Sequence, residues 1–197
     1  MNFKKNFKKI TALAAVMAMA LSMAACGADN AADNTDTAAE STSAAENAAE
    51  TAEILNFIPP EKGEKIAVMT VKDYGEIKIK LFPEAASKGV ENFIGLADMN
   101  YYDELIFHRV IPHFMDQGGD PQGTGMGGQS MWGGQFDGGI PEGLYHFSGA
   151  IAYANSGSTS TNGSQFYIVN TDEGECVSDV SAYPRNVQDM YKEKGGV

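Results

Sequence analysis

Glycine is concentrated between Gly118 and Gly163, a stretch that holds fourteen of the chain's 22 glycines. Such a density favours turns and close backbone approach over helix, because glycine loses more conformational freedom in a regular element than any other residue. Only short apolar segments interrupt it, such as Met131-Trp132 and Ile151-Ala152-Tyr153. We therefore expect short strands joined by turns in this part of the chain.

A hairpin is expected before the glycine-rich stretch. Residues 65–72 are rich in strand formers, and Asp73-Tyr74-Gly75 is a turn signal. In the run that follows, Ile77, Ile79 and Leu81 alternate with lysines and are predicted to face inward.

Helices are expected at two places. Residues 84–98 carry one apolar stripe (Ala86, Val90, Phe93 and Ala97), and residues 184–194 begin at a proline and stop at a glycine. Between them, residues 165–169 form the last clear strand. Short strands, glycine-rich connections and two helices predict a mainly β fold, a closed antiparallel β-barrel with two capping helices.

The N-terminus is typical of an export signal: four lysines by position 9, then an apolar run over residues 10–21, small residues and Cys26. The apolar run is shorter than the roughly 20 residues of a membrane-spanning helix. Residues 21–27 resemble a bacterial lipobox, although Met23 departs from its usual aliphatic residue. This interpretation makes residues 1–25 a signal peptide and places lipid on Cys26, which holds the protein outside the cytoplasm at the bacterial cell membrane. The alternative is an ordinary secretory signal with an incidental cysteine.

Residues 26–53 are predicted to be a linker. From residue 27 on they include seven acids and no lysine, arginine or aromatic residue, so they cannot bury enough apolar surface to offset the entropy of ordering. A flexible tether is the simplest role, with a short alanine-rich helix as the alternative. The folded domain is expected over residues 54–197. The net charge of −12, which becomes −16 without the four signal lysines, argues against a nucleic-acid partner.

Common catalytic and metal-binding patterns are missing from the sequence. It contains no HExxH, paired CxxC or GxSxG, and no phosphate-binding loop. The three histidines, His108, His113 and His146, do not have the spacing of a metal site, and two cysteines cannot form a disulfide framework. We therefore expect no metal and no cofactor.

Two longer motifs are more informative. Residues 107–120 read FHRVIPHFMDQGGD, and residues 153–167 contain YANS and TNGSQFY. They closely resemble the signature stretches of the cyclophilins, whose usual forms are FHRxIxxFMxQGGD and MANxG…TNGSQFFI. The resemblance covers residues 64–175. It implies a cyclophilin-like barrel and a peptidyl-prolyl cis/trans isomerase that needs no cofactor and acts on proline-containing peptides. With the export signal, it predicts unfolded exported proteins as partners, and we expect the protein to be a monomer.

The chemistry of prolyl isomerisation fits one residue of the first motif. Rotation about a peptide bond has a barrier of about 18–20 kcal/mol that comes from C–N resonance. In the twisted state the prolyl nitrogen regains its lone pair, so a fixed cationic donor beside it stabilises the transition state selectively. Arginine stays charged and holds its donors rigidly. Arg109, one of two arginines in the chain, is therefore the catalytic candidate.

The resemblance also implies roles for other residues. The catalytic set is Arg109, Gln117 and Phe114, and the substrate-binding set is Met115, Ala154, Asn155, Gln165 and Tyr167. The aromatic and methionine side chains would form a pocket for the proline ring, and Tyr167 stands where the family usually has Phe. Taken singly, these apolar residues would more often belong to the core. Only their ordered combination favours a site.

The chain departs from the family in three respects. One extra residue lies between Asn155 and Thr161, Tyr153 replaces a usual Met, and the family's later strand and helix segment is not found before Val197. The barrel is therefore expected to be incomplete at its C-terminal end, which would leave two sheet edges exposed. The alternative function is a non-catalytic proline-peptide-binding or chaperone lipoprotein on a truncated cyclophilin scaffold. A passive surface lipoprotein is a third option.

Overall fold

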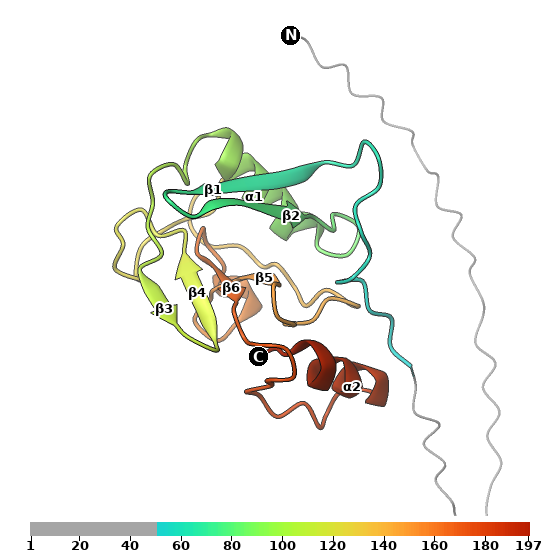
Figure 1. Cartoon of the computed structure of the whole chain (residues 1–197). Coiled ribbons are helices and arrows are strands. Elements are labelled where there is room, and N and C mark those ends of the chain that lie inside the picture. Colours follow the sequence, from blue (N-terminus) through green and yellow to red (C-terminus); the bar gives the residue numbers. More distant parts are fainter. Residues whose placement is uncertain (1–50) are drawn as a thin grey trace, which may run out of the picture. The chain divides into compact units, whose positions relative to one another are not determined.

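The computed structural model describes residues 51–197, which form six strands, two α-helices and one 3-10 turn (Figure 1). The predicted signal peptide, Cys26 and most of the predicted linker lie outside these residues. Among the residues that are described, no helix is long and apolar enough to cross a membrane. In chain order the elements are β1 (Ile66–Val71), β2 (Gly75–Lys80), α1 (Ser87–Asp98), β3 (Arg109–Ile111), β4 (Met115–Gly118), β5 (Ile151–Tyr153), η1 (Thr159–Thr161), β6 (Phe166–Val169) and α2 (Arg185–Lys194).

The predicted hairpin is present as β1 and β2, which pair antiparallel from Ile66 opposite Lys80 to Val71 opposite Gly75. Asp73, in the turn between them, has a φ of 68°, a left-handed conformation that aspartate tolerates better than most residues. Ile79 and Leu81 are buried as expected. Ile77 remains 38% exposed, because it lines an open cavity.

Both predicted helices are present, each shorter at its start than expected. Helix α1 begins at Ser87 because the residues after Pro83 form turns, closed by a hydrogen bond from the Ala86 N–H to the Phe82 carbonyl. It ends in a Schellman motif, in which the N–H groups of Asn100 and Tyr101 donate to the carbonyls of Ala97 and Leu96. Helix α2 begins at Arg185, with Pro184 as its N-cap residue.

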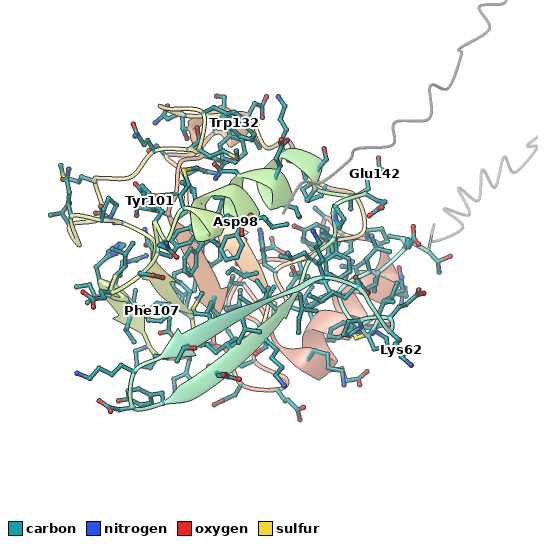
Figure 2. The ribbon with its side chains drawn as sticks, turned by 90° about the horizontal axis from the view of Figure 1, so that it is seen from above. Lys62, Asp98, Tyr101, Phe107, Trp132 and Glu142 are labelled. Atoms are coloured by element: carbon teal, nitrogen blue, oxygen red, sulfur yellow. The ribbon has the colours of Figure 1, made fainter. Side chains whose placement is uncertain are left out.

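The remaining strands form an antiparallel sheet of order β3-β4-β6-β5. One face of this sheet packs under α1 through Phe166, whose ring meets Phe93, Tyr102 and Phe107 edge to face at centroid distances of 5.8, 5.6 and 6.3 Å. Figure 2 shows Tyr101 and Phe107 on this side of the domain, with Trp132 in the glycine-rich segment beyond α1. Such T-shaped aromatic pairs contribute about 0.5–1.5 kcal/mol each beyond the area they bury.

A second apolar cluster holds α2 against the domain. Phe147, Val187 and Tyr191 are fully buried in it, and Ala52 and Ile54 pack against them. Asn186 on α2 accepts from the Ala52 N–H and donates to the Ala52 carbonyl. The packed body therefore includes Ala52, two residues before the predicted start of the domain.

The mainly β fold with two helices is confirmed, whereas a closed barrel is not observed within residues 51–197. There the strands form two separate sheets, and no backbone ladder joins β2 to β5. Ala150 bonds to Val169 of β6 and Ala154 bonds to Gln165 just before β6, so by alternation Ile151 and Tyr153 direct their backbone groups to the open side of β5. The inner side chains of both sheets consequently line one large cavity.

Candidate functional site

Strand register brings the predicted site residues onto one face of the four-stranded sheet. Across the sheet, Arg109 on β3 lies opposite Gln117 on β4, and Gln117 lies opposite Tyr167 on β6. Tyr167 also lies opposite Ala152 on β5. Residues opposite each other across a sheet point to the same side. The face that carries these four residues is the reverse of the face that packs under α1 through Phe166.

Arg109 sits at the exposed rim of this face. Its Nη1 lies 3.5 Å from Gln117 Oε1 and 3.9 Å from Met115 Sδ, both long and therefore weak contacts. Its guanidinium carbon lies 6.0 Å from the centre of the Phe114 ring, at the outer limit of a cation–π contact. Most of the five N–H donors of the guanidinium thus remain available to a ligand.

Two glutamine side chains form a relay behind Arg109. Gln117 Nε2 donates to Gln165 Oε1 at 2.9 Å, and Gln165 Nε2 donates to the Gly127 carbonyl at 2.8 Å. Because each amide nitrogen is engaged in this direction, Gln117 Oε1 is left to accept from Arg109. The relay fixes the direction in which both amide groups point.

Asn170 holds Phe114 in place. The Phe114 N–H donates to Asn170 Oδ1 at 2.8 Å, and the Asn170 N–H donates to the Phe114 carbonyl at 3.2 Å. The Asn170 amide also donates to Asp116 Oδ1 at 2.9 Å. The turn between β3 and β4 is therefore tied to the end of β6, which sets the position of the Phe114 ring.

Met115 and Tyr167 give the face its apolar character. Met115 is buried, and burial raises the pKa of the Tyr167 hydroxyl, with a smaller effect from Tyr183. No hydrogen bond to the Tyr167 hydroxyl is found among residues 51–197. Phenylalanine at this position would therefore lose no recorded polar contact.

The site opens into a cavity of about 1430 Å³, lined by apolar side chains of both sheets. A smaller polar hollow of about 340 Å³ adjoins it along the glycine-rich segment. The eight predicted site residues all line one or both of these spaces: Arg109, Phe114, Met115, Gln117, Ala154, Asn155, Gln165 and Tyr167. The structure thus brings the whole predicted set together, although it does not test their roles. Trp132, given no role from sequence, lines neither space and packs on Phe136.

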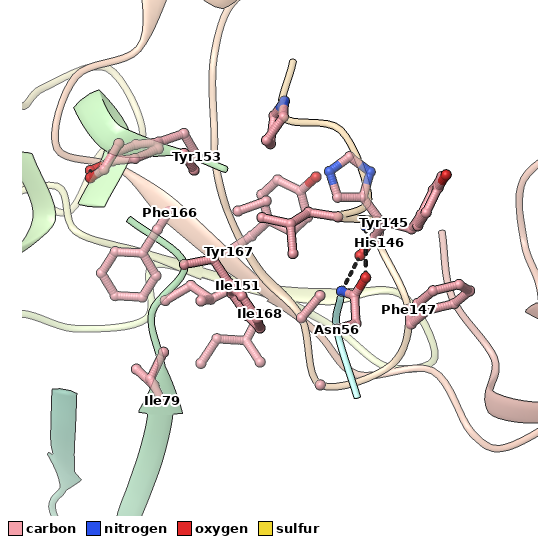
Figure 3. Close-up of a pocket in the computed structure, with 18 of the residues that line it drawn as sticks. Asn56, Ile79, Tyr145, His146, Phe147, Ile151, Tyr153, Phe166, Tyr167 and Ile168 are labelled. Carbon is pink, nitrogen blue, oxygen red and sulfur yellow. Dashed lines mark hydrogen bonds between the residues drawn. The ribbon is translucent and has the colours of Figure 1, made fainter. Parts of the chain in front are cut away.

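Residues that the sequence did not single out also line the cavity. The His146 ring lies 5.9 Å from the Tyr167 ring, and burial lowers the pKa of His146, which favours the neutral imidazole. Asn56 mimics a strand partner: it donates to the Tyr145 carbonyl at 2.8 Å and accepts from the Tyr145 N–H at 2.9 Å (Figure 3). Neither residue belongs to a recognisable motif, so no sequence signal identified them.

Asn155 lies at the end of β5, where a loop takes up the extra residue of the second motif. Its amide donates to Asn162 Oδ1 at 3.2 Å, and its Oδ1 accepts from the Gly157 N–H. Within the described residues, the main-chain N–H and carbonyl of Asn155 have no recorded partner. They are therefore available to pair with an extended peptide.

Asp120 organises the loop that presents Gly127 to the relay. Its carboxylate accepts from the N–H groups of Gln122, Thr124, Gly125 and Gly127 and from the Thr124 hydroxyl. Burial raises the pKa of Asp120, but the backbone N–H groups outweigh it and lower the pKa to about 2. A charged Asp120 therefore holds the polar wall of the site.

Tyr153, which replaces the usual Met of the second motif, connects the sheet to α1. Its hydroxyl donates to the Gly89 carbonyl at 2.8 Å and accepts from Asn92 Nδ2 at 2.9 Å. Asn92 is completely buried, and it also donates to the Gly163 carbonyl and accepts from the Met131 N–H. Burial raises the pKa of Tyr153 to about 12, although the bond from Asn92 lowers it slightly.

Fold and site together define a β-domain with a peptide-sized cleft in which a cationic hydrogen-bond donor borders an apolar slot. Residues 66–183 match the family described as cyclophilin type peptidyl-prolyl cis-trans isomerase/CLD. The chain therefore belongs to the cyclophilin-type peptidyl-prolyl cis-trans isomerase family.

Similar proteins include one from Streptococcus pyogenes serotype M6, provisionally named a bifunctional phosphatase/peptidyl-prolyl cis-trans isomerase. It is 44% identical over 137 residues, which are 68% of this chain but only 28% of that protein. A Staphylococcus aureus USA300 protein, provisionally named a peptidyl-prolyl cis-trans isomerase, is 45% identical over 140 residues, covering 69% of this chain and 70% of that protein. A crystal structure of a Cryptosporidium parvum cyclophilin, determined with the dipeptide Ala-Pro, is 42% identical with a TM-score of 0.47, and the match covers 50% of this chain and 64% of that one.

Proposed function

We propose that this protein accelerates cis/trans rotation about X-Pro peptide bonds. The observation that carries the proposal is the position of the Arg109 guanidinium, 6.0 Å from the Phe114 ring centre and beside the glutamine relay, at the mouth of the apolar slot. The family to which the chain belongs supports the same activity.

In the proposed mechanism, the proline ring enters the slot formed by Phe114, Met115 and Tyr167. The backbone of the substrate pairs with the main chain of Asn155, which holds the residue before proline while the prolyl bond turns. Arg109 then donates to the prolyl nitrogen, whose lone pair is available only when the amide is twisted. No proton is transferred, so the reaction needs no acid or base, and the neutral His146 has no part in it.

Gln117 is assigned a positioning role. Its Oε1 faces Arg109 Nη1 at 3.5 Å, and its own amide nitrogen is held by Gln165. Binding of substrate would expel water from the rim, which strengthens the contact between Arg109 and Gln117 and the bond from Arg109 to the prolyl nitrogen.

The substitution Arg109→Ala tests the mechanism. We expect it to lower kcat/KM for a short Ala-Pro peptide by roughly a hundredfold, comparable to the loss of one preorganised donor in other enzymes. The rate is measured by NMR exchange between the cis and trans peptide, and folding is checked by circular dichroism. Arg185→Ala, which removes the only other arginine, an exposed residue of α2, is the matched control and should leave the rate unchanged. An unchanged rate in Arg109→Ala contradicts the mechanism.

The second candidate is a non-catalytic proline-peptide-binding or chaperone protein. It is favoured by the open cavity, because the inner faces of both sheets are left accessible to a peptide. If proline peptides bind and neither the unaltered protein nor Arg109→Ala changes the exchange rate, this candidate replaces the first.

We further propose that the protein is a monomer, held by lipid on Cys26 outside the bacterial cytoplasm, where it assists the folding of exported proteins. The lysine-rich start, the apolar run and the cysteine at position 26 support this setting. Mass spectrometry of the N-terminal peptide, compared with Cys26→Ser, tests the lipid. We also propose that the two sheets belong to one antiparallel barrel, since Ile79 of β2 and Ile168 of β6 line the same cavity.

A further inference from the structure

Three potential metal ligands meet on the surface beside the proposed site. His113 lies in the turn between β3 and β4, and Asp172 and Glu175 lie in the segment after β6. His113 Nδ1 is 3.1 Å from Asp172 Oδ2 and 3.0 Å from Glu175 Oε2. The three ligand atoms all lie within 4.8 Å of one another.

The convergence leaves the imidazole with more acceptors than it can satisfy. Nδ1 carries at most one hydrogen, whereas two carboxylate oxygens approach it. Within residues 51–197, neither Asp172 nor Glu175 has a lysine or arginine within 4 Å. With the proton on Nε2, the His113 Nδ1 and the two carboxylate oxygens all have a lone pair that could bind a cation.

The chain holds these ligands in position from both sides. His113 has a φ of 59°, a left-handed turn conformation, and the neighbouring Phe114 is tied to Asn170 by backbone and side-chain hydrogen bonds. In the facing segment, the Glu175 N–H donates to the Asp172 carbonyl, and the Gly196 N–H donates to the Glu175 carbonyl. The ligands therefore come from two segments already fixed against each other, which lowers the entropy lost on binding.

We propose that His113, Asp172 and Glu175 form a binding site for a divalent transition-metal ion, most suitably Zn²⁺. One imidazole and two carboxylates form a set that zinc accepts, and three protein ligands leave a fourth position for water. Bonds of about 2.0–2.1 Å in a tetrahedral site place ligand atoms about 3.3 Å apart, close to the 3.1 and 3.0 Å that separate His113 Nδ1 from the two carboxylate oxygens. The exposure of the ligands, 57%, 75% and 42%, indicates a site of modest affinity that exchanges readily with solvent.

Titration of the full chain with Zn²⁺ by calorimetry tests the site, and Co²⁺ absorption reports the coordination geometry. We expect one ion per chain. His113→Asn, Asp172→Asn and Glu175→Gln should each weaken binding roughly tenfold or more, at least the loss seen when an outer-shell partner is removed. Asparagine suits position 113 because it tolerates a positive φ. Glu173→Gln is the matched control, since it removes a carboxylate from the same turn without touching the group.

The possible results of the Zn²⁺ titrations differ from one another, and none of them depends on isomerase activity. Loss of binding in the three ligand variants with retention in Glu173→Gln supports the site. Equal affinity in all variants, or no binding at millimolar Zn²⁺, overturns it. Loss in Cys176→Ser together with full retention in His113→Asn also overturns it, because the metal would then be held by the thiol.

Discussion

The charge of Asp120 is expected to stabilise the folded state in a pH-dependent way. Its pKa falls from 3.8 to about 2 on folding, because four backbone N–H groups point at the carboxylate. One pKa unit corresponds to about 1.36 kcal/mol, so the full shift would contribute on the order of 2 kcal/mol. Three of the residues that donate to Asp120 (Gln122, Thr124 and Gly125) are exposed to water, which screens the interaction, so we expect about 1–2 kcal/mol.

The direction of the pKa shift of Asp120 determines how its contribution to stability changes with pH. A carboxyl group whose pKa is lower in the folded state contributes fully above its unfolded pKa, and the contribution is lost as the pH falls toward its folded pKa. Asp120 therefore contributes fully above about pH 4 and progressively less down to about pH 2. Asp120→Asn should lower the free energy of unfolding at pH 7, with a fall in Tm of about 2–8 °C.

Urea unfolding of both proteins at a series of pH values from 7 to 2.5 measures the effect. We expect the difference in unfolding free energy between wild type and Asp120→Asn to be constant above pH 5 and to shrink below pH 4. Asp137→Asn is the control, since Asp137 is exposed and accepts a single backbone bond, from Gly139. A difference that stays constant down to pH 2.5 would refute the reasoning.

Two further substitutions test the packing and the slot. Asn92→Ala removes three buried hydrogen bonds and should cost about 3 kcal/mol or more of unfolding free energy, measured by chemical denaturation; a loss below 1 kcal/mol would contradict the role given to Asn92. Tyr167→Phe removes a hydroxyl without a recorded partner. We expect kcat/KM for Ala-Pro peptides to rise roughly twofold, because less polar surface of the slot then loses water when the proline ring binds. A fall in the NMR exchange rate would show that the hydroxyl contacts the substrate.

Local signals predicted the β1–β2 hairpin, β6 and both helices, but not β3 or β4. Alternation and a turn signal located β1 and β2, and an apolar stripe at helical spacing located α1 to within three residues at its start and none at its end. These patterns depend on residues near one another in sequence. Ile77 has the right alternation but stays partly exposed, because its burial depends on what covers the cavity and not on its neighbours in the chain.

The candidate site was predictable because its residues lie within two long motifs. What the sequence could not give is the pairing between distant residues. Tyr153 reads as a departure from the family pattern, yet its hydroxyl bridges Asn92 and Gly89, about sixty residues away. His113 meets Asp172 and Glu175 because the pairing of β4 with β6 and the bonds of Asn170 hold its turn beside the end of β6. No rule based on the spacing of residues in the sequence predicts such contacts.

The loop that follows Asn155 satisfies several of its polar groups within itself, and the Gly138 N–H ties it to a second segment by donating to the Thr159 carbonyl. Ser158 and Thr161 close it through side-chain and backbone hydrogen bonds, and nothing lies within 4 Å of the space where Gly157 would carry a Cβ. Ser156 and Thr161 of this loop line the smaller hollow and Thr159 lines the large cavity, so the length and composition of the loop help to shape the neighbouring cleft. A fluorophore attached at the exposed Ser156 would therefore sit at the edge of this hollow, where a change in its emission would report the arrival of a ligand.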